Sequence, residues 1–163
     1  MNSSTDELAS VVSSLVITCK NAQEGFELAA ERVRDFELRA FLGDCGRLRG
    51  DMIDDLKVAQ RELGMESDTD VDAGSDVASA ADGSDGSGHP WMESQAVIAD
   101  GDDCQMLTQC RRGEELAVAE YRDGIERGLP AELESLVRRQ FAVIVATCER
   151  LRSLEKNCKT KPR

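Results

Sequence analysis

The side chains that could do chemistry in this chain are its carboxylates, its six cysteines and its single histidine. A di-metal centre inside a bundle of helices takes a Glu from each of two helices and a Glu-x-x-His motif from each of the other two. The only histidine, His89, lies in a stretch of Gly, Ser and Pro, so no helix can supply that motif. The sequence therefore predicts no complete di-metal site.

Four other side chains fall on or near the apolar stripes of the predicted helices: Gln23, Glu114, Gln140 and Cys148. Glu114 is the one acid on these stripes. We expect Gln23, Glu114 and Gln140 to meet near the middle of the bundle as a hydrogen-bonded polar layer that decides which helices pair. The alternative is a metal site of unusual composition that uses these residues and Cys148. Iron is the metal considered for it; otherwise no cofactor is expected.

The acids at positions 68, 70 and 72 alternate as they do in a calcium-binding loop. An EF-hand also needs Gly at its sixth position and Glu at its twelfth, where this chain has Ala73 and Ser79. A solvated acidic linker is the preferred interpretation, and a calcium-responsive linker is the alternative.

The six cysteines, at positions 19, 45, 104, 110, 148 and 158, form no C-x-x-C pair. Most of them lie inside helical patterns. We interpret them as reduced, buried packing residues of a cytoplasmic protein. A redox pair of Cys104 and Cys110 is the alternative.

Apolar residues recur every three or four positions over four long stretches, the pattern of amphipathic helices. In the second stretch the predicted buried stripe includes Leu48. Asp35 is a candidate N-cap, and Gly64 and Gly128 are candidate left-handed helix ends. The short turns after the first and third helices predict two antiparallel hairpins. The predicted helices span about residues 5–33, 36–63, 103–127 and 131–157.

The excess negative charge lies between the two predicted hairpins. The formal net charge is -12, and residues 62–110 hold twelve acids and no Lys or Arg. We expect residues 65–88 to be a mobile acidic connection and residues 89–101 to be a crossover anchored on the bundle by His89 and Trp91. Repulsion from this segment disfavours nucleic acid and anionic membranes as partners.

The whole chain, residues 1–163, is predicted to be one all-α domain in which a long crossover joins two antiparallel hairpins. Several short motifs carry a resemblance to a known family. They are CKNAQEGF at 19–26, HPWM at 89–92 before a Gly-Asp-Asp step at 101–103, CRRGEE at 110–115, and residues 134–152.

On these motifs the chain resembles a bacterial ferritin-like four-helix-bundle family of unknown function. The resemblance implies a ferritin-like fold and no specific activity. Relatives tend to have an acid at the position of Gln23 and a histidine near position 148, where this chain has an uncharged amide and the thiol of Cys148.

Complete apolar stripes combined with missing metal ligands lead us to expect a non-enzymatic bundle that acts by protein interaction or self-association. An iron-binding, oxidase-like protein with a degenerate site is the second hypothesis. No signal peptide or membrane span is evident in the sequence, so we expect a cytoplasmic protein without membrane contact.

Overall fold

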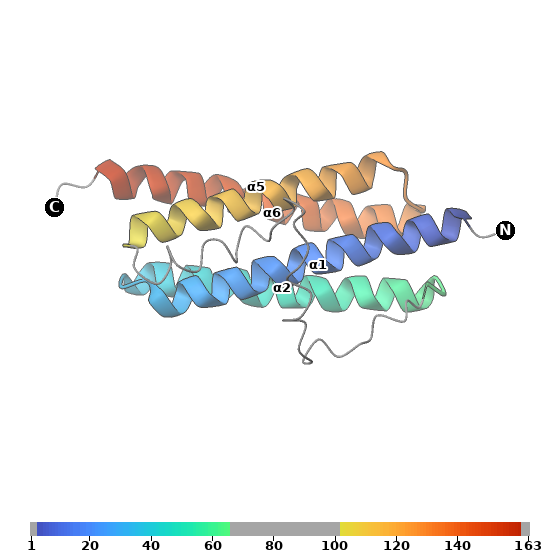
Figure 1. The fold of residues 1–163 in the computed structure, drawn as a ribbon, viewed down its shortest axis with the longest axis horizontal. Helices are drawn as coiled ribbons and strands as arrows, with labels where there is room; N and C mark the ends of the chain where they lie inside the picture. Colours follow the sequence, from blue (N-terminus) through green and yellow to red (C-terminus); the bar gives the residue numbers. More distant parts are fainter. Residues whose placement is uncertain (1–2, 66–101, 161–163) are drawn as a thin grey trace, which may run out of the picture.

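The computed structural model describes residues 3–65 and 102–160, which form four α-helices and no strand. The prediction of an all-α fold with four helices is confirmed for these residues. The predicted crossover over 89–101, with His89 and Trp91, lies outside the described residues, as does the acidic connection apart from Met65. The helices are α1 (Ser3–Arg32), α2 (Phe36–Glu62), α5 (Asp103–Glu126) and α6 (Ala131–Thr160) (Figure 1).

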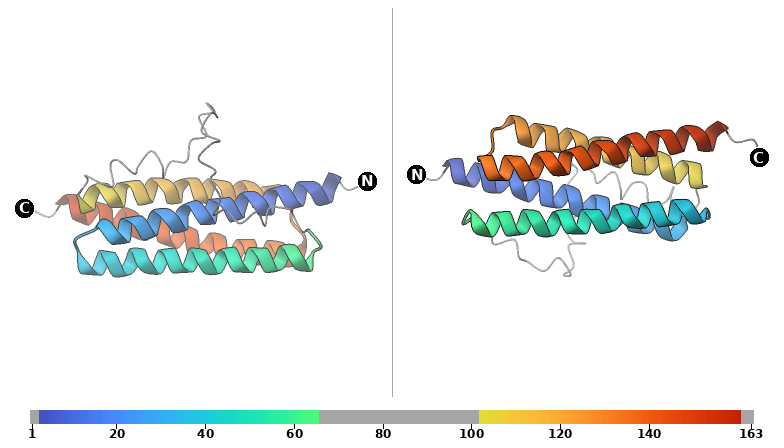
Figure 2. Two further views of the ribbon diagram at one scale, coloured as in Figure 1. Left: turned by 60° about the horizontal axis from the view of Figure 1, so that its bottom comes forward. Right: turned by 180° about the vertical axis from the view of Figure 1, so that it is seen from behind.

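The four helices run side by side along one long axis (Figures 1 and 2). α1 packs against α2, α5 packs against α6, and α1 also lies against α5, whereas α2 and α6 make a smaller contact. The end of α2 and the start of α5 lie at opposite ends of the bundle (Figure 1). None of the described helices has the length and apolar character that crossing a membrane requires.

Local signals in the sequence account for the helix ends. The Asp35 carboxylate caps α2 by accepting a hydrogen bond of 3.0 Å from the backbone N–H of Leu38. Asp102 caps α5 and forms a capping box with Gln105. Gly64 and Gly128 have positive φ angles of 66° and 83°, so both predicted left-handed ends are confirmed.

Asp103, the first residue of α5, ties the two halves of the bundle together at one end. Its carboxylate oxygens accept hydrogen bonds from the backbone N–H groups of Arg34 and Asp35, at 2.9 and 3.0 Å. Because these donors form the turn between α1 and α2, one carboxylate holds that turn against the start of α5.

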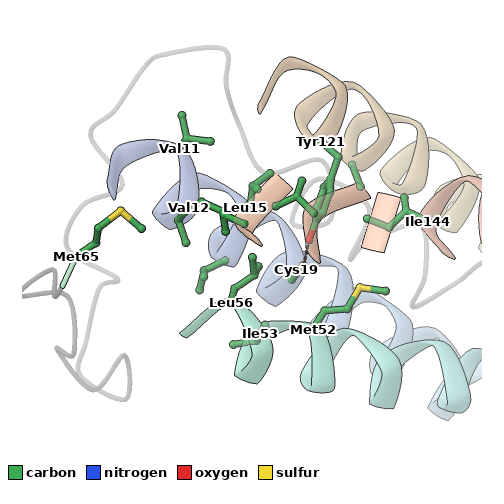
Figure 3. Close-up of a cluster of buried hydrophobic side chains, with 14 residues drawn as sticks. Val11, Val12, Leu15, Cys19, Met52, Ile53, Leu56, Met65, Tyr121 and Ile144 are labelled. Carbon is green, nitrogen blue, oxygen red and sulfur yellow. Dashed lines mark hydrogen bonds between the residues drawn. The ribbon is translucent and has the colours of Figure 1, made fainter. Parts of the chain in front are cut away.

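The apolar core consists of two clusters of buried side chains, one toward each end of the bundle. Figure 3 shows the first, in which Val12 and Leu15 of α1 lie beside Leu56 of α2. Along their own helices, Arg49 and Glu114 lie between the residues of the two clusters. The middle of the bundle is therefore polar and its two ends are apolar.

The predicted stripe of α2 is wrong at Leu48. Leu48 is 45% exposed, and the neighbouring Arg49 is buried with 2% exposure. Cys45 and Met52 are both buried and are seven residues apart, so helical periodicity allows either position 48 or 49 to lie between them. Hydropathy favoured the leucine, but Glu114 across the bundle stabilises a buried cation at position 49.

The expectation that all six cysteines are reduced is also wrong, because Cys104 and Cys158 form a disulfide with their Cα atoms 5.7 Å apart. The two residues are 54 positions apart in the sequence. They meet because the start of α5 and the end of α6 share one end of an antiparallel pair (Figure 1). The other four cysteines are buried free thiols, one on each helix.

Candidate functional site

A buried ion pair occupies the middle of the bundle. The Arg49 guanidinium of α2 donates to the Glu114 carboxylate of α5, and the two side chains are 2% and 0% exposed. Arg49 also lies over the ring of Phe26, with its Cζ atom 5.9 Å from the ring centre. Its Nη1 atom lies 3.6 Å from the sulfur of Met52. The cation is thus held by three neighbours from three helices.

A chain of hydrogen bonds next to this pair joins all four helices. The Cys19 sulfur of α1 lies 3.0 Å from the Tyr121 hydroxyl of α5 (Figure 3). That hydroxyl donates to Gln140 Oε1 of α6 at 2.8 Å, and Gln140 Nε2 donates to the Met52 carbonyl of α2 at 3.2 Å. Since the single hydroxyl proton is used toward Gln140, the Cys19 thiol must be the donor to Tyr121.

We call Cys19, Arg49, Glu114, Tyr121 and Gln140 the central polar layer. Burial raises the pKa of the Tyr121 hydroxyl and of the Cys19 thiol, so both remain protonated donors at neutral pH. The layer is therefore a defined set of donors and acceptors rather than a set of reactive anions.

Glu114 is the titratable centre of this layer. Burial is the largest influence on its carboxyl and outweighs the opposing attraction of Arg49, so its pKa is raised to about 7. Its Oε2 atom accepts from Arg49, whereas Oε1 is buried without a hydrogen-bond partner among the described residues. A proton on Glu114 would reside at that second oxygen.

This raised pKa predicts how stability depends on pH. Between pH 4.5 and about 7 the folded chain keeps a proton on Glu114 that the unfolded chain has released. The free energy of unfolding should therefore fall as the pH rises through this window, by up to ~1.4 kcal/mol per pH unit and ~3 kcal/mol in total. Urea unfolding of the full chain at pH 5, 6 and 7 measures it.

The matched control for that measurement is Glu114→Gln, which keeps the shape of the side chain and cannot titrate. Its free energy of unfolding should vary less between pH 5 and pH 7 than that of the wild type. Identical pH slopes in the two proteins would show that Glu114 has an ordinary pKa in the folded state.

The four residues predicted to form the polar layer or the alternative metal site lie in different surroundings. Glu114 and Gln140 are both buried in the centre. Gln23 is half-buried beside Gly50, and its Nε2 atom lies 3.0 Å from where a Cβ at that glycine would be. Cys148 is buried two turns beyond Gln140 on α6. The structure thus places Gln23 at the contact between α1 and α2.

Arg49 is the functional residue that the sequence-based reasoning missed, together with the hydrogen-bonding role of Tyr121. A signal for Arg49 was present: Glu114 was the one acid on a buried stripe, and a buried carboxylate requires a partner. Arg49, one position from Leu48 of the predicted α2 stripe, was one of the cations available.

The donor set at the centre does not fit a di-iron site. Within residues 3–65 and 102–160, no three His, Cys, Asp or Glu side chains come close enough to hold a metal ion. The Arg49 guanidinium beside Glu114 would repel a cation placed there. Burial also raises the pKa of the Cys45 thiol to about 12, which keeps it protonated and a poor ligand.

Comparison with models of known protein families identifies the family of this chain. Residues 7–127 match the model of a family described as a domain of unknown function, DUF2383. The chain belongs to this family. The DUF2383 match contains Cys19, Arg49, Glu114 and Tyr121 of the central polar layer, and Gln140 of α6 lies beyond it. A search of curated proteins found no significant match.

Proposed function

We propose that this DUF2383 protein is a non-enzymatic, ferritin-like bundle of two hairpins that acts by protein interaction or by self-association. The buried Arg49–Glu114 pair is the observation that carries the proposal. It lies in the middle of the four helices, where the metal ligands of a ferritin-like protein would converge. In this chain the position is taken by a cation and its counter-ion.

The central polar layer is suited to fixing how the four helices pair with one another. Replacing a buried ion pair by apolar residues is often neutral or stabilising, so such a pair is weak evidence for stability as such. Its directional bonds instead favour one rotation and one register for each helix. Here the bonds reach all four helices, and a one-residue slip of any helix would leave a buried donor or acceptor unpaired.

The second candidate function is iron binding at a degenerate site. One observation favours it: Glu114 Oε1 has no hydrogen-bond partner among the described residues and could accept a ligand. The ion pair through the other oxygen of the same carboxylate opposes it, since a metal would have to displace or tolerate the Arg49 guanidinium.

Iron loading separates the two candidates. The purified full chain is supplied with iron(II), desalted and subjected to elemental analysis, while oxygen consumption is followed with an electrode. We expect iron far below one equivalent per chain, with the same value in Glu114→Gln. A full di-iron complement that Glu114→Gln loses, together with oxygen consumption, would contradict the proposal.

Light scattering at increasing protein concentration tests the mode of action. A mass that rises above 17.8 kDa in multiples of the chain supports self-association. A constant monomer mass excludes self-association and leaves interaction with a different protein as the mode of action.

A further inference from the structure

A second polar network lies on the surface between α5 and α6, near the Cys104–Cys158 disulfide. Its centre is Glu155, which is 6% exposed and accepts hydrogen bonds from the Thr108 hydroxyl and the Lys159 ammonium, both at 2.8 Å, and from the Arg111 guanidinium. Burial alone would raise the pKa of Glu155, but these donors outweigh it and lower the pKa to about 2. The carboxylate is therefore ionised at neutral pH.

Around this carboxylate is an open groove of about 410 Å³, lined by Arg111, Arg152, Glu155, Lys156 and Lys159. We call it the α5–α6 groove. Glu115 at its edge accepts from Arg111 at 2.8 Å and from Arg152 at 3.2 Å. Two carboxylates thus hold three of the four cations in place.

The groove retains an excess of positive charge. Four cations against Glu115 and Glu155 leave a surplus of two charges. Lys156 makes no ion pair with any residue in the described part of the chain. Arg152 commits its Nη2 atom to Glu115, and a guanidinium has further N–H donors beyond that one.

This surplus is unusual for the chain, whose formal net charge is -12. α6 carries six basic and four acidic side chains, whereas α1 carries two basic and five acidic, and α5 carries three basic and six acidic. The basic residues of the groove are therefore a local feature of α6 and its contact with α5, and they do not reflect a generally basic surface.

We propose that the α5–α6 groove binds a phosphoryl group, as free phosphate or as a phosphate monoester on a partner. A phosphoryl group carries about -1.5 to -2 charges at neutral pH, which matches the surplus of two. Its oxygens accept the charge-assisted hydrogen bonds that guanidinium and ammonium groups donate. Glu115 and Glu155 hold the side chains of Arg111 and Lys159 in position before a ligand binds. Less side-chain entropy is therefore lost when the phosphoryl group binds. The inference does not depend on the function proposed above.

Titration of the ¹⁵N-labelled full chain with sodium phosphate at pH 7.5 tests this inference. The readouts are the backbone amides and the arginine Nε–Hε signals, with sodium chloride at matched ionic strength as the reference. We expect saturable shifts at Arg111, Arg152 and residues 155–159. Shifts that sodium chloride reproduces would overturn the proposal.

Two charge reversals on α6 provide the matched pair of variants. Lys156→Glu should weaken phosphate binding by about tenfold or more. Arg138→Glu reverses an exposed arginine that is paired with Glu134 near the other end of α6, and it should leave binding unchanged. An equal loss in both variants would show that only the net charge matters, and the groove would not be a site.

A phosphoserine peptide in a parallel titration distinguishes the two sources of the phosphoryl group. Tighter binding of the peptide than of phosphate supports a phosphorylated protein partner. Equal or weaker binding of the peptide supports the free ion as the ligand. Absence of saturable binding by both would overturn the proposal.

Discussion

Replacing Arg49 by Met should lower the free energy of unfolding by up to about 3–5 kcal/mol at pH 8, where Glu114 must either stay charged without a counter-ion or take up a proton that the unfolded chain does not bind at this pH. The methionine is apolar and of similar length, so the loss would come mainly from the missing counter-ion and not from a cavity. The loss in the free energy of unfolding should be smaller at pH 5. Without Arg49, which lowers the Glu114 pKa, the carboxyl would be neutral there.

Urea unfolding followed by circular dichroism at both pH values measures this loss. Arg47→Met is the matched control, since Arg47 is an exposed arginine of the same helix whose ion-pair partner among the described residues is the exposed Asp44. It should change stability by no more than ~0.5 kcal/mol. An equal effect of the two substitutions would show that Arg49 is not buried in an ion pair.

The double variant Arg49→Met/Glu114→Leu examines what the pair is for. We expect it to recover most of the lost stability, because both charges are removed from the interior together. If the pair specifies helix pairing, the recovered protein should unfold less cooperatively or change its mass in light scattering. A double variant with unchanged cooperativity and unchanged mass would contradict a specificity role.

Breaking the Cys104–Cys158 disulfide should lower the free energy of unfolding by about 4 kcal/mol, the loop-closure entropy for a separation of 54 residues. The bond joins the first turn of α5 to the last turns of α6, so the reduced chain should lose helix at these ends first. Urea unfolding with and without a reducing agent measures the change.

The Cys104→Ser/Cys158→Ser double variant is the control, since the reducing agent should leave its stability unchanged. A thiol titration under denaturing conditions checks the bond itself, with four free thiols expected for the oxidised wild type. Six thiols in protein purified without reductant would mean that the disulfide does not form in solution.

Much of the secondary structure could be predicted from the sequence because its causes are local. Asp35 and Asp102 cap helices through bonds to residues three positions away. Gly64 and Gly128 end helices through their own backbone angles. The spacing of Val12, Leu15 and other apolar residues describes a buried stripe without knowledge of what covers it.

The residues of the candidate site could not be predicted from the apolar stripes alone, because a stripe does not show which residues of other helices face it. Hydropathy ranks Leu48 above Arg49, and only the rotation of α2 that brings Arg49 to Glu114 reverses that order. Gln23 and Gln140 looked equivalent in the sequence, yet one faces a neighbouring helix at Gly50 and the other bonds to Tyr121.

The sequence by itself therefore determined four helices, their ends and the absence of a Glu-x-x-His motif from them. The tertiary structure decided the Arg49–Glu114 pair, the hydrogen bonds from Cys19 to Gln140, the Cys104–Cys158 disulfide and the α5–α6 groove. The physical reason is the distance along the sequence over which each interaction acts. Caps and periodicity act over a few residues, whereas each of these contacts depends on how helices distant in sequence rotate against one another.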